Sequence, residues 1–316
     1  MSNDNYSTGL YLSRYKLNLF GNFTYFQEDP LNGDAHEQVD RRWIYGGHFE
    51  FQRELTSRIN LRAGTDMRSD QIGEVSLHAV ENRIRLGLVR QDSVDWLSLG
   101  VFSELEIDIS DKLRSFLGIR LDYSDYNVLA NLSDNSGKGS DDIWLPSIGF
   151  AYEVGSFGEL YLNWGKGFHS NDVRGATIAF DPLSNDELEP VVLFSGQDGA
   201  EVGYRVERDD DLVLSLAYFW LQSDSELIFA GDSGGTEASD GSERSGLELA
   251  VFWELNSNWV VDVSGSFTDS KFVGVDSRFN HIPNAHGRVI SMGLTRAPLL
   301  GWNWSMRVRH FGDAAL

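Results

Sequence analysis

The chain contains 316 residues, no cysteine and a formal net charge of −22 at pH 7. Without cysteine it can have no disulfide, no CxxC metal site and no thiol catalysis, and so negative a chain without a basic stripe is a poor partner for nucleic acid. Its mean hydropathy of −0.29 fits both a soluble protein and a β-barrel, because a barrel strand turns every second residue toward a polar interior.

The residue types favour strands over helices. The sequence has 32 Gly and 6 Pro, with 9 Trp, 11 Tyr and 19 Phe, a mixture suited to long strands, tight bends and aromatic belts. It has no run of about 18 apolar residues that could form a membrane helix, and the segment after Met1 lacks the basic and apolar regions of a secretory signal. We therefore expect an all-β protein whose export signal lies in a segment before Met1.

Alternation of apolar and polar residues is the main structural signal. It extends over segments of roughly 10 residues, the length that a tilted strand needs to cross a bilayer. In chain order it is clearest in 113–124, 212–221, 259–268 and 302–309. One face of the first segment consists of Leu117, Ile119, Leu121 and Tyr123, and the other of Arg114, Gly118, Arg120, Asp122 and Ser124. The pattern predicts antiparallel transmembrane strands with one lipid face and one wet face.

Aromatic side chains recur near the ends of the apolar faces, where an indole or phenol ring can lie at the level of the lipid headgroups. The residues are Trp43, Trp96, Tyr123, Trp164, Trp253, Trp259 and Trp302. The alternative is that they form the core of a soluble β-sandwich, whose strands average about 5 to 6 residues. The longer segments here favour a membrane barrel.

The connections between these segments alternate in length. The short ones lie near residues 55–58, 110–112, 154–158, 208–211, 256–258 and 297–301. The long ones lie near residues 29–40, 72–95, 129–142, 170–197, 231–242 and 274–284. Short periplasmic turns and long extracellular loops are typical of an up-and-down membrane barrel, here with about 13 membrane strands. Residues 83–90 are interpreted as an additional strand inside a loop.

An odd number of strands indicates part of a barrel. Bacterial single-chain barrels close with an even number, and an open edge in lipid leaves backbone groups unsatisfied. The chain also stops at Leu316 immediately after a predicted strand. We therefore expect a partial barrel that is truncated at both ends.

Three stretches resemble the barrel region of TonB-dependent receptors. They are FGNFTYFQEDPLNGDAHEQVDRRW from Phe20 to Trp43, ELYLNWGKGFHSNDVRGA from Glu159 to Ala176 and GAEVGYRVERDDDLVLSLAYFWLQSDSELIF from Gly199 to Phe229. In that family the second pattern is a strand that rises to the outer surface and breaks into a loop at the GFHSND segment. In this sequence the segment falls at the start of a long connection, where the alternation of loop lengths independently places it.

The resemblance implies a barrel of about 22 strands with an occluded lumen. It also implies an N-terminal plug, a scarce nutrient as ligand (an iron siderophore, haem, cobalamin, a metal chelate or a glycan) and uptake driven by TonB, which pulls on a short box before the plug. The sequence contains no TonB box, no plug and no terminal aromatic residue of the kind that closes such barrels. We therefore expect residues 1–316 to be a receptor-like β-barrel domain without a plug.

Signals for catalysis and metal binding are weak. The seven His residues are scattered, without HExxH or another close ligand spacing. We expect no enzyme activity, no cofactor and no metal site.

Charges on the wet face are the first group of candidate functional residues. They should point into the lumen, because an Arg or Lys that faces lipid at mid-depth costs about 2 to 4 kcal/mol. These lumen-facing charges are Arg62, Asp66, Glu104, Glu106, Arg114, Arg120, Asp122, Glu248, Arg307 and Arg309. In a receptor they would contact a plug or line the substrate path; the alternative is that they only pair with one another across neighbouring strands.

The loop 168–180 supplies the second group, because it mixes a stacking surface with polar donors and acceptors. Its candidate ligand-binding residues are Phe168, His169, Asn171, Asp172 and Arg174. The alternative is a packed transition from strand to loop that contacts no ligand.

The function expected from these features is that of an outer-membrane receptor and transporter barrel for TonB-dependent uptake of a scarce nutrient, such as an iron siderophore or other metal chelate. Its partners would be outer-membrane lipid, the small-molecule nutrient, and TonB through an N-terminal segment that this sequence lacks. One alternative is a plug-free porin-like or fatty-acid-type channel. A second is a secreted, soluble all-β carbohydrate-active protein.

Overall fold

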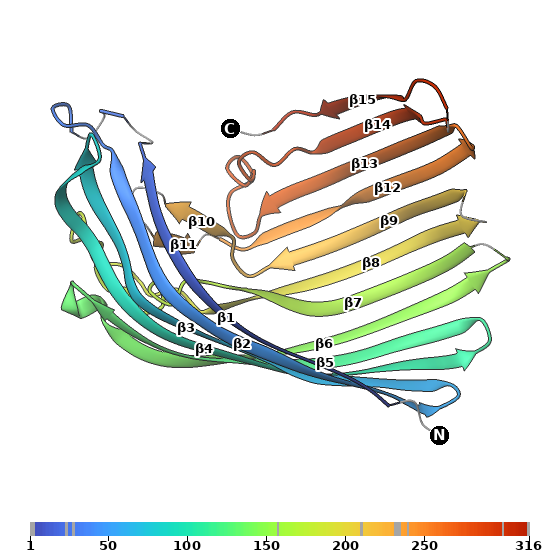
Figure 1. Cartoon of the computed structure of the whole chain (residues 1–316), viewed down its shortest axis with the longest axis horizontal. Helices are drawn as coiled ribbons and strands as arrows, with labels where there is room; N and C mark the ends of the chain where they lie inside the picture. The colour runs from blue at the N-terminus through green and yellow to red at the C-terminus, as the bar shows by residue number, and fades with distance from the viewer. Residues whose placement is uncertain are drawn as a thin grey trace.

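The structure, a computed structural model, is a single large antiparallel sheet that curls around a hollow (Figure 1). It describes residues 4–22, 25–26, 29–156, 158–208, 211–230, 235–238, 240–298 and 300–314. Among these residues thirteen strands are hydrogen-bonded in the order β1-β2-β3-β4-β5-β6-β7-β8-β9-β12-β13-β14-β15. The prediction of an all-β, up-and-down arrangement of about 13 strands is confirmed.

The strands are long and are joined to their neighbours in sequence order. Their bounds are β1 Asp4–Gly21, β2 His36–Thr56, β3 Ile59–Glu81, β4 Ile84–Ser110, β5 Leu113–Ala130, β6 Gly137–Val154, β7 Gly158–Ser170, β8 Phe194–Arg208, β9 Leu212–Ser223, β12 Ser242–Asn256, β13 Trp259–Phe272, β14 Arg288–Arg296 and β15 Trp304–Phe311. A separate hairpin, β10 (Leu227–Ala230) with β11 (Gly235–Ala238), lies in the connection from β9 to β12, and a 3-10 turn, Ser133–Asn135, follows β5. No helix among the described residues is long and apolar enough to cross a membrane.

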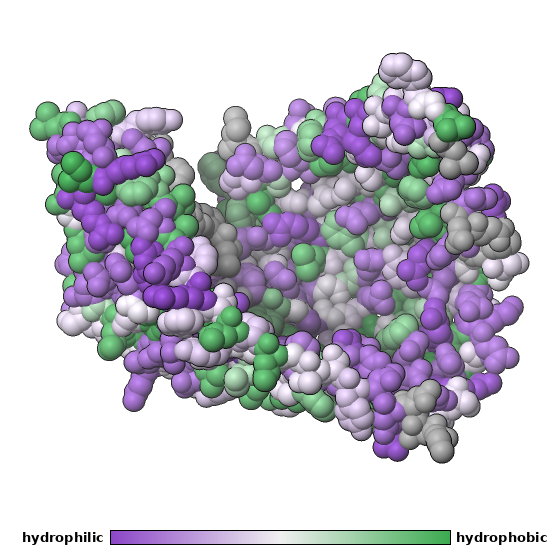
Figure 2. Space-filling view, in the orientation of Figure 1, coloured by the Kyte–Doolittle hydropathy of each residue, from purple (hydrophilic) through white to green (hydrophobic). Residues whose placement is uncertain are grey.

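The two faces of the sheet differ in chemistry because side chains alternate along every strand. One face exposes a band of large apolar side chains, among them Leu117, Ile119, Trp144 and Leu162, which are 39%, 42%, 58% and 51% exposed. A continuous apolar surface of this kind in water would be an aggregation hazard, whereas lipid covers it at no cost. Hydrophilic residues occur throughout the hollow that the sheet encloses (Figure 2).

The connection expected at 72–95 is not a loop. Strands β3 and β4 run through it and meet at a two-residue turn, where Asn82 and Arg83 have φ of 51° and 67°. Two successive positive φ values are typical of the type I′ turn that matches the twist of a hairpin. The strands have 23 and 27 residues, far more than the about 9 to 11 that cross a bilayer. Beyond the lipid neither face needs to be apolar, so the alternation that marks a strand fades although its backbone ladder continues.

The expectation that Trp96 belongs to the aromatic belt is wrong. Trp96 lies on the inner face of β4, opposite Asp70 of β3 and Tyr126 of β5, and its indole N–H donates to Ser124 Oγ at 2.5 Å. The lipid-facing residue beside it is Leu97. Trp96 is therefore not part of the aromatic belt, because the register of β4 turns it into the hollow.

A small apolar core ties the connection between β7 and β8 to the inner face. Val173 and Leu193 from this connection pack with Ile72, Val94 and Val128 of β3, β4 and β5. All five are at most 7% exposed. The segment 171–193 is therefore folded into the mouth of the hollow, and we refer to it as the mouth loop.

Candidate functional site

The inner face of the sheet carries the predicted lumen charges. The strand register places all ten on the face opposite the apolar band: Arg62, Asp66, Glu104, Glu106, Arg114, Arg120, Asp122, Glu248, Arg307 and Arg309. They come from β3, β4, β5, β12 and β15, so the structure distributes them around the hollow and does not gather them into one site.

Most of the inward arginines are held by carboxylates. Arg120 binds Asp66 at 2.8 Å and Asp122 at 2.6 Å, Arg62 binds Glu50 at 2.7 Å, and Arg307 binds Asp262 at 2.7 Å. A second set joins Arg114 and Arg205 to the same carboxylate of Glu159. Pairing across neighbouring strands thus occupies much of the charge on the inner face, which keeps its net field weaker than the number of ions suggests.

Four of the inward charges have no ion pair within the described part of the chain: Glu104, Glu106, Glu248 and Arg309. Glu104 and Glu106 lie with Arg62 along a groove of about 340 Å³ near the short turns. Glu248 lies with Tyr161 and Glu201 along another, of about 390 Å³. These carboxylates remain available to groups that enter the hollow.

Two inner-face ion pairs cross a middle strand, and a glycine makes room for each. Gly100 lies between Asp66 and Asp122, and a Cβ there would be 1.9 Å from Arg120 Nη2. Gly293 lies between Asp262 and Arg307, and a Cβ there would be 2.3 Å from Asp262 Oδ1. Glycine is required at these positions by the close approach of side chains and not by its backbone conformation.

The mouth loop is anchored by buried asparagines. Asn171 is 1% exposed; its backbone N–H donates to Leu193 O at 2.8 Å and its Nδ2 to Val192 O at 2.5 Å. Asn135, in the turn after β5, is also 1% exposed and holds the far side of the loop. Its Oδ1 accepts the backbone N–H groups of Ala179 and Phe180 at 2.8 and 2.9 Å, while its Nδ2 donates to Phe180 O at 2.8 Å. The asparagines thus satisfy backbone groups of the loop that water does not reach.

Charges add a second anchor to the mouth loop. Arg174 binds Asp172 at 2.6 Å and lies 3.7 Å from Asp92 of β4, which in turn binds Arg90 at 2.6 Å. The side chains of Arg90 and Asp92 are 4% and 0% exposed. Burial alone would raise the pKa of Asp172, but the charge and hydrogen bonds of Arg174 outweigh it and lower the pKa below its usual value. The loop is therefore fixed to the barrel wall by ionised groups.

The five candidate ligand-binding residues separate into two groups. Asn171, Asp172 and Arg174 lie together and hold the mouth loop. Phe168 and His169 are consecutive in β7 and point to opposite faces: Phe168 packs edge-on against Phe194 at 4.8 Å, and His169 Nδ1 lies 3.4 Å from Gln197 Nε2. By strand alternation Phe168 shares the face of Trp164 and Lys166, and its ring partner Phe194 packs against the apolar core beneath the mouth loop. That any of the five contacts a ligand stays a prediction.

The inner mouth contains an ion network that sequence reasoning missed. Arg42 of β2 binds both Asp40 and, at 3.2 Å, Asp70 of β3, and Arg68 binds Asp70 at 2.6 Å. Asp40, Arg42, Arg90 and Arg174 line a cavity of about 160 Å³. Arg68 and Asp70 could have been found from the sequence, because the alternation along β3 places both on the inner face. Arg90 and Asp92 were missed because residues 72–95 were interpreted as a loop. No group of three or more potential metal ligands occurs among the described residues.

Comparison with known proteins places this architecture in a family. The sequence matches the family described as TonB dependent receptor-like, beta-barrel over residues 2–315. Among similar solved structures, the ferric yersiniabactin uptake receptor FyuA from Yersinia pestis is 14% identical with a TM-score of 0.69, and the match covers 93% of this chain and 44% of FyuA.

Two further structures show the same relation. The copper transporter OprC is 14% identical with a TM-score of 0.73, covering 96% of this chain and 49% of OprC. The ferric-catecholate import receptor Fiu from E. coli K12 is 13% identical with a TM-score of 0.70, covering 93% of this chain and 49% of Fiu. At these identities the likeness concerns the fold, and the chain spans about half the length of the proteins it matches.

Proteins of the matched family sit in the outer membrane and are transporters, not enzymes. They take up siderophores or metal chelates in partnership with TonB. The open sheet of thirteen antiparallel strands, with its apolar outer band and charged inner face, corresponds to part of their barrel. The chain therefore belongs to the TonB-dependent receptor β-barrel family.

Proposed function

We propose that this barrel wall serves TonB-dependent uptake of a scarce nutrient across the outer membrane, with an iron siderophore or other metal chelate as the ligand class. The observation that carries the proposal is the family match over residues 2–315. The wet inner face and a mouth loop folded into the hollow are consistent with a ligand that enters from outside. Two of the matched structures are iron-chelate receptors by their titles and one is a copper transporter.

In this proposal residues 1–316 form the wall and mouth of the receptor. The mouth loop and the cavity lined by Arg42 and Arg174 would lie on the path of an anionic metal chelate into the hollow. Occlusion of the lumen and coupling to TonB would be supplied by segments other than this domain. Phe168, His169, Asn171, Asp172 and Arg174 remain the proposed ligand contacts, with Asn171 acting through the position of the loop because it is buried.

The experiment is uptake of radiolabelled iron, offered as several ferric chelates, by cells that carry the complete gene, with and without functional TonB. We expect uptake of at least one chelate that disappears without TonB. An Arg174→Gln variant should reduce it, because the mouth loop loses its ionic anchor. Arg278→Gln, which changes an exposed arginine in the connection from β13 to β14, is the matched control and should leave uptake unchanged.

The alternatives predict different results. Uptake that needs no TonB and depends only on solute size would favour a porin-like channel. Recovery of the protein as a stable monomer without detergent would favour a soluble all-β protein and would contradict the membrane proposal.

A further inference from the structure

The outer face of the sheet has a charged rim just beyond its apolar band, on the side of the long loops. On most strands the run of lipid-facing apolar side chains ends, toward those loops, at a first ionisable residue. On seven strands it is a carboxylate: Glu74 on β3, Asp95 on β4, Asp125 on β5, Asp142 on β6, Asp198 on β8, Glu243 on β12 and Asp269 on β13. On β7 and β14 it is a single cation, Lys166 and Arg288. Most of the rim is therefore acidic, in keeping with the net charge of −22.

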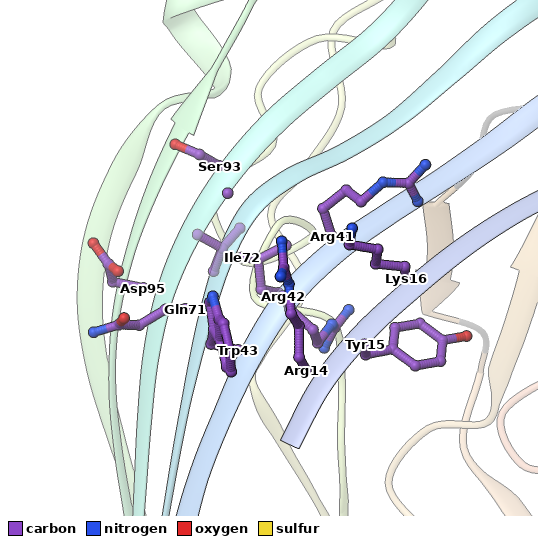
Figure 3. Close-up of a pocket in the computed structure, with 12 residues that line it drawn as sticks. Arg14, Tyr15, Lys16, Arg41, Arg42, Trp43, Gln71, Ile72, Ser93 and Asp95 are labelled. Carbon is purple, nitrogen blue, oxygen red and sulfur yellow. The ribbon is translucent and has the colours of Figure 1, made fainter. Parts of the chain in front are cut away.

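Strands β1 and β2 differ in carrying three cations side by side on this rim. After Leu12 the lipid-facing residues of β1 are Arg14 and Lys16, and after Trp43 that of β2 is Arg41. The register pairs Arg14 with Trp43 and Lys16 with Arg41, so the four side chains occupy one patch, which we call the rim cluster. Figure 3 shows these residues on two neighbouring strands along a groove of about 570 Å³.

The groove is opened by a β-bulge. Gly73 of β3 is an extra residue relative to both neighbouring strands. On the β2 side, Ile72 and Glu74 pair with the consecutive residues Arg42 and Arg41. On the β4 side, Ile72 and Val75 pair with Val94 and Asp92, so two residues of β3 lie opposite one of β4. A bulge of this kind bends the strand and leaves its extra residue out of the ladder. The backbone of the barrel wall thus forms the groove, at the level of the charged rim.

The three cations of the rim cluster form no ion pair with any described residue, although the register places Glu74 of β3 opposite Arg41. The Arg14 guanidinium lies over the Trp43 ring, 5.1 Å from its centroid. Arg41 donates to Leu17 O and to Asn18 Oδ1 and has no ion pair. By contrast, Lys166 and Lys271, which lie above the band on β7 and β13, have carboxylates at 3.9 and 3.1 Å.

Asp95 also lines the groove, but at its other end. In Figure 3 it lies beside Gln71, away from Arg14 and Lys16. The end of the groove near β1 and β2 therefore combines three cations that form no ion pair with an interfacial indole ring. That combination is suited to a ligand with an anionic head and an apolar body.

We propose that the rim cluster binds the phosphate of a phosphorylated lipid headgroup in the outer leaflet of the membrane. Arg14, Lys16 and Arg41 supply charge-assisted hydrogen bonds to phosphate oxygens, and Trp43 packs against the acyl boundary below them. The position fits a lipid because the cluster lies directly above lipid-facing residues and faces away from the hollow. The inference depends on the membrane location of the barrel and not on which nutrient the barrel transports.

The test is native mass spectrometry of the protein extracted from the outer membrane in mild detergent, with lipid A or fully dephosphorylated lipid A added. We expect retention of the phosphorylated lipid only. In the triple variant Arg14→Gln/Lys16→Gln/Arg41→Gln retention should weaken about 100-fold, about 5-fold for each cation removed. The pair Lys166→Gln/Lys271→Gln is the matched control and should bind as the unchanged protein does.

Two additional measurements separate the explanations. The charge-preserving variant Arg14→Lys/Lys16→Arg should retain the lipid, which shows that the triple variant lost binding through charge and not through misfolding. Inorganic phosphate at the same concentration should not displace the lipid. Equal retention by the triple variant, equal retention of dephosphorylated lipid, or displacement by free phosphate would each overturn the proposal.

Discussion

At the scale of single residues, the inner face depends on close contacts that only small side chains permit. Arg120 reaches Asp66 across β4 because Gly100 offers no side chain in its path. The guanidinium is about one third exposed, so the ion pair contributes less to stability than a buried one would. The packing of the arginine over the glycine is the stronger constraint.

Replacement of Gly100 tests this contact. Gly100→Val should lower the free energy of unfolding by about 1 to 3 kcal/mol, because the new side chain displaces Arg120. Gly87→Val is the control in the same strand, since a Cβ there meets nothing within 4 Å, and its effect should stay within about 0.5 kcal/mol. Urea unfolding of the membrane-inserted protein, followed by tryptophan fluorescence, measures both. Equal effects of the two substitutions would show that strand geometry and not the Arg120 contact is responsible.

At the scale of elements, the mouth loop is the segment whose position matters most for function, and it is held from two sides. Val173, Leu193 and Arg174 attach it to the inner wall. Asn135 attaches it to the turn after β5 through three hydrogen bonds. A loop held in this way presents one fixed surface at the mouth until its anchors are released.

Removal of the Asn135 side chain should release one side of the loop. In Asn135→Ala the amides of Ala179 and Phe180 lose their acceptor, and a buried unsatisfied group costs about 1 to 3 kcal/mol. Hydrogen exchange at these two amides should therefore accelerate by about 10- to 100-fold. Asn127→Ala, at an exposed asparagine of β5, is the control. Unchanged exchange in Asn135→Ala would mean that the core contacts alone fix the loop.

At the scale of the whole molecule, the thirteen strands form an open sheet with β1 and β15 at its edges. Unpaired backbone groups at an edge within lipid cost several kcal/mol each. Residues 1–316 expressed alone should therefore aggregate or misassemble in detergent. Gel electrophoresis of heated and unheated samples measures this, with a complete receptor barrel as the positive control. A discrete heat-modifiable band from these residues alone would contradict the expectation.

Much of the fold could be predicted because lipid imposes a period of two on each membrane strand. The alternation at 113–124 predicted β5, whose register places Arg114, Arg120 and Asp122 on the face opposite the apolar band. Above the lipid that constraint ends, and there prediction failed: 72–95 is not a loop, and Trp96 lies on the inner face. The candidate site was predicted less well for the same reason. It lies in the mouth, above the lipid, where alternation no longer marks which side chains point inward.

The sequence by itself determined the class of fold and the number of strands, because local alternation records which face of each strand is apolar. Only the tertiary structure decided which charges meet. The Arg90–Asp92–Arg174 anchor joins residues more than eighty positions apart in the chain, and the rim cluster joins β1 to β2 beside a bulge in β3. Such contacts depend on strand register and on the path of a loop, and no local pattern of residues encodes them.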